Sequence, residues 1–154
     1  MDNDYNDVMN KGWDELPETQ LTPRGTYRLK ARSVAEVLPK EKGASGKVLV
    51  TYTPVEAMDD VDEAAMQAFE AAGLDVRDQE IVVTFWLGKV KDWHRLKAHI
   101  ALHGVDLSQF RDNKRDALKA MKGCEIMATV QPRKFTVNKE ERVEDTAVNF
   151  KAVE

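Results

Sequence analysis

Polar and apolar side chains alternate along five stretches of the chain, and this alternation predicts five β-strands. In the first stretch the apolar residues from Tyr27 to Ala31 fall on one face and the basic residues between them on the other. In the last stretch Val148, Phe150 and Ala152 are expected to share a face. The five strands are expected over residues 26–37, 47–53, 80–87, 124–137 and 142–153.

Three further segments show helical spacing of their apolar residues instead. Residues 60–73 form the first of them, with Asp60 and Glu63 placed as in a capping box at its start. The other two helices are expected over residues 89–103 and 113–122, and each ends near a glycine that favours helix termination.

The order of these elements is that of the OB-fold, a small five-stranded Greek-key barrel, here with a helix between the third and fourth strands. The sequence therefore predicts a mainly β, α+β fold, with an extra helix inserted between the second and third strands. Residues 21–154 are expected to form this single OB-like domain, and residues 54–80 its acidic helical insert. Residues 1–20 show no sustained period and are rich in Asp and Asn, so we expect a largely disordered acidic tail.

Length and composition exclude several classes of protein. A chain of 154 residues builds one hydrophobic core and seldom two. Its single cysteine cannot form an internal disulfide framework, which favours a reducing compartment. No apolar stretch reaches the roughly 18 residues of a membrane span, and the start of the sequence has no apolar signal core. We therefore expect a cytoplasmic protein that does not contact membranes.

The formal net charge of −4 conceals a segregation of charge along the chain. The formal charge is −5 for residues 1–20, +5 for 21–53, −8 for 54–80 and +4 for 81–154. A polyanion responds to the local field of a protein rather than to its summed charge. Two acidic blocks thus mask two basic ones, and a nucleic acid is a reasonable partner for the basic blocks.

OB-folds bind oligonucleotides on the face around strands two and three and with the loops joining strands one to two and four to five. The basic residues of this chain fall on strand one and around those two loops: Arg28, Lys30, Arg32, Lys40, Lys42, Lys47, Arg133, Lys134, Lys139 and Arg142. Single strands also need aromatic planes for their unstacked bases, and Tyr52, Trp86 and Phe135 are the expected planes. Alternation turns Trp86 outward if Phe85 points inward. The alternative for Tyr52 and Trp86 is a place in the core.

Four stretches carry a resemblance to a known group of proteins: GTYRLKA at 25–31, LHG at 102–104, LKAMKGCEIMATVQPRKF at 118–135 and AVNFKAV at 147–153. Together with the basic first loop, they resemble small phage-encoded single-stranded-DNA-binding proteins with OB-folds. The resemblance implies a replication or recombination accessory that coats single-stranded DNA without sequence preference in the bacterial host cytoplasm. It also implies that the acidic tail recruits replication or recombination proteins, and it leaves homo-oligomerisation open.

Metal binding and catalysis have little support in the sequence. His99 and His103 are neighbours on one helix face, but His94 lies far around the helix and Cys124 is the only thiol. We interpret the histidines as ordinary helix surface and Cys124 as a buried, inert thiol. No nucleophile stands in a catalytic context, so we expect a protein that is not an enzyme and holds no metal or cofactor.

Two other functions remain open at this point. The chain could be a protein-interaction module that recruits or inhibits a host factor through the acidic tail and insert, with those acids mimicking nucleic acid. It could also bind duplex DNA or RNA rather than single-stranded DNA.

Overall fold

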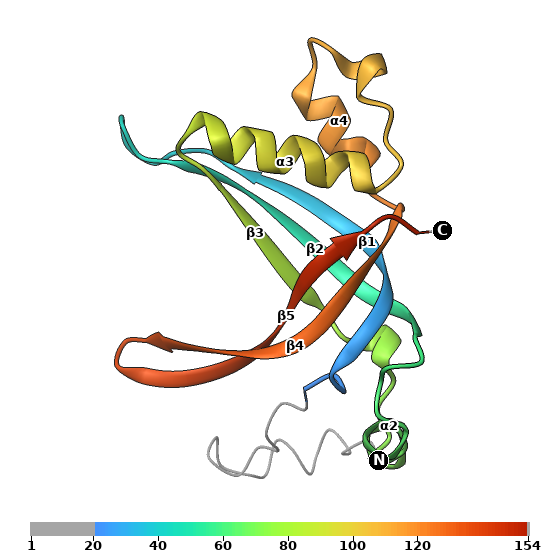
Figure 1. Cartoon of the computed structure of the whole chain (residues 1–154). Coiled ribbons are helices and arrows are strands. Elements are labelled where there is room, and N and C mark those ends of the chain that lie inside the picture. The colour runs from blue at the N-terminus through green and yellow to red at the C-terminus, as the bar shows by residue number, and fades with distance from the viewer. Residues whose placement is uncertain (1–20, 154) are drawn as a thin grey trace, which may run out of the picture.

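A five-stranded antiparallel sheet is the frame of the fold in the computed structural model, which describes residues 21–153 (Figure 1). The strand order is β3-β2-β1-β4-β5, with β1 at the centre. The strands are β1 (Gly25–Val37), β2 (Gly46–Ala57), β3 (Ile81–Leu87), β4 (Glu125–Val137) and β5 (Glu140–Lys151). The two outermost strands, β3 and β5, come into contact, so the sheet curls, although no ladder joins them within the described residues.

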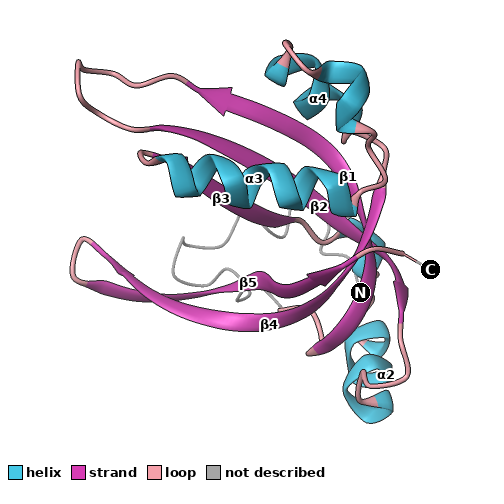
Figure 2. Ribbon diagram, turned by 45° about the horizontal axis from the view of Figure 1, so that its top comes forward, coloured by secondary structure: helices cyan, strands magenta, loops and turns pink. Residues whose placement is uncertain are grey.

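The helices stand at the two ends of this curled sheet (Figure 2). Helix α2 (Glu63–Ala71) and the short helix η2 (Val76–Asp78) connect β2 to β3, while α3 (Val90–Leu102), the short helix η3 (Leu107–Phe110) and α4 (Lys114–Ala120) connect β3 to β4. Helix α3 contacts both β3 and β5. This is the strand order and helix placement of an OB-fold, and it confirms the predicted α+β class, including the extra helix between the second and third strands.

Side-chain alternation along β1 and β2 builds the core. Tyr27, Leu29 and Ala31 are buried on β1, and Ala31 lies opposite buried Tyr52 on β2. The larger core cluster continues through Val48 and Val50 on β2 and includes Ile81, Leu96, Ile100, Met121, Ile126 and Val130. The period of two that is visible in the sequence therefore reports correctly which face of the central strands is buried.

The start of α2 differs from its predicted capping. Asp62, and not Asp60, is the N-cap, and its carboxylate accepts a hydrogen bond from the backbone N–H of Ala65 at 2.9 Å. Asp60 instead accepts hydrogen bonds from Thr26, at 2.8 Å from the backbone nitrogen and 2.7 Å from the hydroxyl. These bonds hold the pKa of Asp60 below its ordinary value. Asp60 thus ties the acidic insert to the beginning of β1.

Strand β5 also differs from its predicted alternation. Asn149 has a φ of 55°, and the pairing of β4 with β5 shifts between Met127 and Thr129. A bulge of this kind changes which side chains face inward. As a result Ala147 and Phe150 contribute to the core, whereas Val148, Phe150 and Ala152 were expected to share a face.

The predicted acidic tail, residues 1–20, lies outside the described residues. Within residues 21–153, no helix is both long enough and apolar enough to cross a membrane.

Candidate nucleic-acid interface

Trp86 stands on the outward face of the sheet, as the sequence predicts. It belongs to β3, where Val83, Phe85 and Leu87 pack partly buried against the core. The intervening Trp86 is 58% exposed. Lys47 lies opposite it on β2, and the Lys47 ammonium is 4.8 Å from the centre of the indole ring. A planar aromatic surface and a cation are therefore presented together on the β2–β3 face.

Two hairpins flank this face. The β1–β2 hairpin carries Lys40 and Lys42 in its exposed loop, and the β4–β5 hairpin turns at Asn138 and Lys139, which have φ of 51° and 67°. Both hairpins project toward the same side of the molecule, and β3 lies between them in both views (Figures 1 and 2). Strand β3, which carries Trp86, thus lies in the region that the two hairpins frame.

The β4–β5 hairpin is less basic than its lysines and arginines suggest. Arg133, Lys134 and Arg142 lie in the strands rather than in a loop, and only Lys139 occupies the turn. Residues 132–145, both ends included, contain four basic and four acidic residues. Two of the basic ones have close acidic partners: Lys134 lies 3.7 Å from Glu141, and Arg142 lies 3.8 Å from Glu140. The expected basic loop is therefore a strand pair with no surplus of positive charge.

Phe135 is half-buried on this hairpin, directly opposite Arg142. Along β4, alternation turns Phe135 to the same face as Arg133 and away from the face on which Val130 is buried. The structure therefore brings Phe135 together with two arginines on the outer side of the hairpin.

The basic residues of β1 do not gather around Trp86. Arg28 lies 3.0 Å from Glu56 and 3.3 Å from Glu125, so two carboxylates already neutralise it. Its partner position on β2 is nine residues beyond Lys47, or about 30 Å along the strand. Lys30 and Arg32 are exposed and nearer along the strand, with Arg32 at a bulge beside Ala31. Of the three, Arg28 is the least suited to meet a phosphate.

The prediction of Tyr52 as a stacking surface is wrong, because its side chain is fully buried. Its hydroxyl lies 2.6 Å from Nε2 of His99 and 2.8 Å from Nε2 of His103. Nδ1 of His103 lies 2.8 Å from the carbonyl oxygen of His99, which can only accept, so Nδ1 of His103 carries the proton. Nε2 of neutral His103 then accepts from the Tyr52 hydroxyl, and the Tyr52 oxygen accepts from Nε2–H of His99. The three side chains thus form one directed hydrogen-bond chain.

The interpretation of His99 and His103 as helix surface is also wrong. Both are buried, at 5% and 6% exposure, between α3 and the sheet. Burial, together with the neighbouring His103, lowers the pKa of His99 to about 3, and burial likewise lowers the pKa of His103. Both rings are therefore neutral at pH 7 and belong to the interior of the protein. Among the described residues, no three His, Cys, Asp or Glu side chains are grouped to hold a metal ion.

Cys124 stands just before β4 and is half-buried rather than fully buried. Its thiol donates a hydrogen bond to the carbonyl oxygen of Ala120 at 3.2 Å.

The sequence reasoning missed where the positive charge of the C-terminal half lies. Residues 81–122 contain nine basic and four acidic residues, whereas residues 123–154 contain five basic and six acidic ones. The surplus therefore belongs to the segment of β3, α3 and α4, not to the β4–β5 hairpin. Counting charge by structural element instead of by block would have revealed it.

Comparison with known proteins finds distant structural likeness but no match in sequence. No protein-family model matches the chain, and no curated protein matches its sequence. Among solved structures, yeast RPA bound to ssDNA superposes with a TM-score of 0.40 and 10% sequence identity, over 97% of this chain and 86% of that one. A likeness at this level carries no argument about function, so the functional case depends on the geometry above.

Proposed function

We propose that this protein binds single-stranded DNA, largely without sequence preference, across the β2–β3 face and between its two hairpins. The observation that carries the proposal is the outward, 58% exposed Trp86 with the ammonium of Lys47 at its ring. More than half of this large aromatic side chain is therefore accessible to a ligand. Together with the Lys47 ammonium, it offers a single strand an aromatic plane for a base and a cation for a phosphate.

The physical basis is the combination of stacking and charge. Stacking of a base on an aromatic side chain contributes about 1–3 kcal/mol and accepts any base, because every base has a π-face. Lys47 beside Trp86, and Lys40 and Lys42 on the neighbouring loop, can neutralise phosphates on either side of a stacked base. Phe135, between Arg133 and Arg142, is a second aromatic position on the opposite hairpin.

The finer role is that of a phage replication or recombination accessory that coats single strands in the host cytoplasm. The resemblance of about residues 24–153 to phage-encoded single-stranded-DNA-binding proteins supports this role. The acidic residues 1–20 are then the expected site for replication or recombination proteins. Nothing in the proposed role requires catalysis.

Fluorescence anisotropy of a labelled oligo-dT tests the proposal. Trp86→Ala is expected to weaken binding by about fivefold to a hundredfold, since one stacking partner is lost, while Trp86→Phe keeps most of the affinity. Val82→Ala is the matched control, because Val82 is 49% exposed on the same face of the same strand. Competition with unlabelled RNA and duplex DNA separates the single-strand proposal from its rivals. Equal affinity for all Trp86 variants would contradict it.

A further inference from the structure

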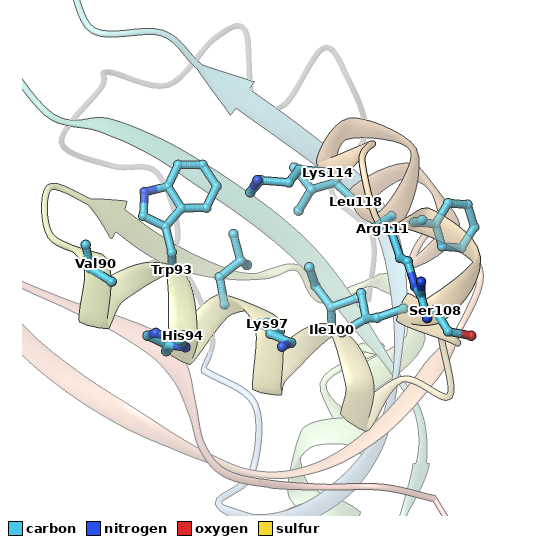
Figure 3. A pocket seen from close by; sticks show the side chains of 13 residues that line it. Val90, Trp93, His94, Lys97, Ile100, Ser108, Arg111, Lys114 and Leu118 are labelled. Atoms are coloured by element: carbon cyan, nitrogen blue, oxygen red, sulfur yellow. The ribbon is translucent and has the colours of Figure 1, made fainter.

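A second tryptophan–lysine pair lies on α3, outside every residue that the sequence analysis selected for binding. Trp93 is 40% exposed in the first half of this helix. The ammonium of Lys114, at the start of α4, is 6.0 Å from the centre of its ring. Figure 3 shows the Lys114 chain and the Trp93 ring facing one another across a groove. The arrangement repeats that of Trp86 and Lys47 on a different pair of elements.

Trp93 stands where two hollows of the surface meet. The groove between α3 and α4 has a volume of about 570 Å³, and a second hollow of about 520 Å³ separates α4 from the β1–β2 hairpin. Trp93, Lys114 and Leu118 line both. Lys47, whose ammonium covers Trp86, lines the second hollow as well. Lys47 therefore borders both the Trp86 ring and the second hollow, and Trp93 connects that hollow with the α3–α4 groove.

The α3–α4 groove has an apolar floor and a cationic rim. Leu96, Ile100 and Leu118 form the floor, and Lys97, Arg111 and Lys114 supply positive charge. No acidic residue lines this groove. It also lies within the segment 81–122, which carries nine basic and four acidic residues. An apolar slot with an aromatic wall and a cationic rim suits a ligand that is flat, apolar and attached to anions.

We propose that a single strand of nucleic acid continues from Trp86 over Trp93 into the α3–α4 groove, so that Trp93 stacks a base and Lys114 and Arg111 meet the flanking phosphates. This proposal rests on the proposed single-strand function and names a second part of the same site. The lining residues that the two hollows share and the cationic rim of the α3–α4 groove both favour a nucleic acid here. The binding path would then extend from the sheet onto the helices, where the surplus of positive charge of this half of the chain lies.

A length series of dT oligonucleotides, from about 4 to about 16 nucleotides, tests the path, because single-strand sites on OB-folds fall in this range. Trp93→Ala and, separately, Lys114→Ala are expected to leave the shortest oligonucleotide unaffected and to lower affinity for the longest about fivefold or more. Lys91→Ala is the matched control, because Lys91 is an exposed α3 lysine that lines neither hollow. Urea unfolding of the full-length variants checks that each one folds.

Two results would overturn the path without touching the proposed function. The first is that both variants bind every length as the wild type does, while Trp86→Ala still weakens binding. The second is that a peptide of the acidic residues 1–20, rather than DNA, loses affinity on Trp93→Ala, which would make the groove a protein-docking site. If the wild type binds no oligonucleotide of any length, the proposed function itself fails.

Discussion

The ammonium of Lys47 lies 4.8 Å from the centre of the Trp86 ring, on neighbouring strands and in direct register. The two residues make different interactions with a single strand: the ring stacks a base, and the lysine neutralises a phosphate. Their contributions can therefore be separated by salt.

Lys47→Ala is expected to reduce the steepness with which ssDNA affinity falls with salt, by about 0.7 in the slope of log K against log salt, because one phosphate contact is lost. Trp86→Ala is expected to lower affinity at every salt concentration and to leave that slope unchanged. Anisotropy titrations at four or more salt concentrations measure both effects. Lys151→Ala, which removes the same charge from β5 at the other end of the strand order, should behave like the wild type.

Tyr52→Phe is expected to lower the free energy of unfolding by about 2 kcal/mol or more, because two buried imidazole nitrogens lose their shared hydroxyl partner. Tyr27→Phe is the matched control. It removes an equally buried hydroxyl, but one that donates only to the carbonyl oxygen of Pro23, at 2.6 Å, so we expect a smaller loss of about 1 kcal/mol. Urea unfolding measures both losses. If Tyr52→Phe instead weakened DNA binding with stability unchanged, the buried role of Tyr52 would be wrong.

Stability is expected to fall as the pH is lowered from 7 to 5. In the folded protein the pKa values of His99 and His103 lie below the ordinary 6.5, at about 3 for His99. As the pH falls, these histidines therefore bind protons in the unfolded chain before they do so in the folded protein. Below about pH 6.5 each of these two histidines therefore lowers the free energy of unfolding by up to about 1.4 kcal/mol per pH unit, until the pH reaches its pKa in the folded protein.

Urea unfolding between pH 7 and 5 measures the slope. A flat profile from pH 7 to 5 in the wild type would mean that the two buried histidines accept protons in the folded state.

Gly25→Ala is expected to destabilise the protein by about 3 kcal/mol, through backbone strain and overpacking together. Gly25 has a φ of +152°, and a Cβ there would meet Val61 Cγ2 at 2.5 Å, where the acidic insert crosses the start of β1. Gly43 also has a positive φ, +89°, but has open space around it. Gly43→Ala should therefore cost only the strain, about 1 kcal/mol. Equal losses for the two variants would show that Val61 moves aside.

Periodicity predicted most of the fold, because the alternation of β1 to β3 and the stripe on α3 are strong and local. It failed at β5, where a bulge at Asn149 resets the alternation, and at Asp60, whose partner Thr26 is 34 residues away. Neither a bulge nor a long-range hydrogen bond leaves a periodic mark in the sequence.

The candidate site was predicted in part. The outward position of Trp86 followed from alternation alone. Tyr52 was assigned to the binding face, with the core as the open alternative, because alternation does not say which aromatic finds buried partners. Its partners His99 and His103 come from a helix about 50 residues away. Trp93 was predicted only as part of the helix over residues 89–103. Its exposure depends on how α4 packs beside α3. The periodicity of the sequence does not predict such a tertiary contact.

The salt dependence of oligo-dT binding by the full-length protein tests the central claim most directly. The account predicts measurable binding at about 50 mM salt and a linear fall of log K with log salt, with a slope of roughly −0.7 for each phosphate that the protein neutralises. The same titration on a chain lacking residues 1–20 shows whether the acidic segment masks the site. Absence of binding at about 50 mM salt by both chains would contradict the account.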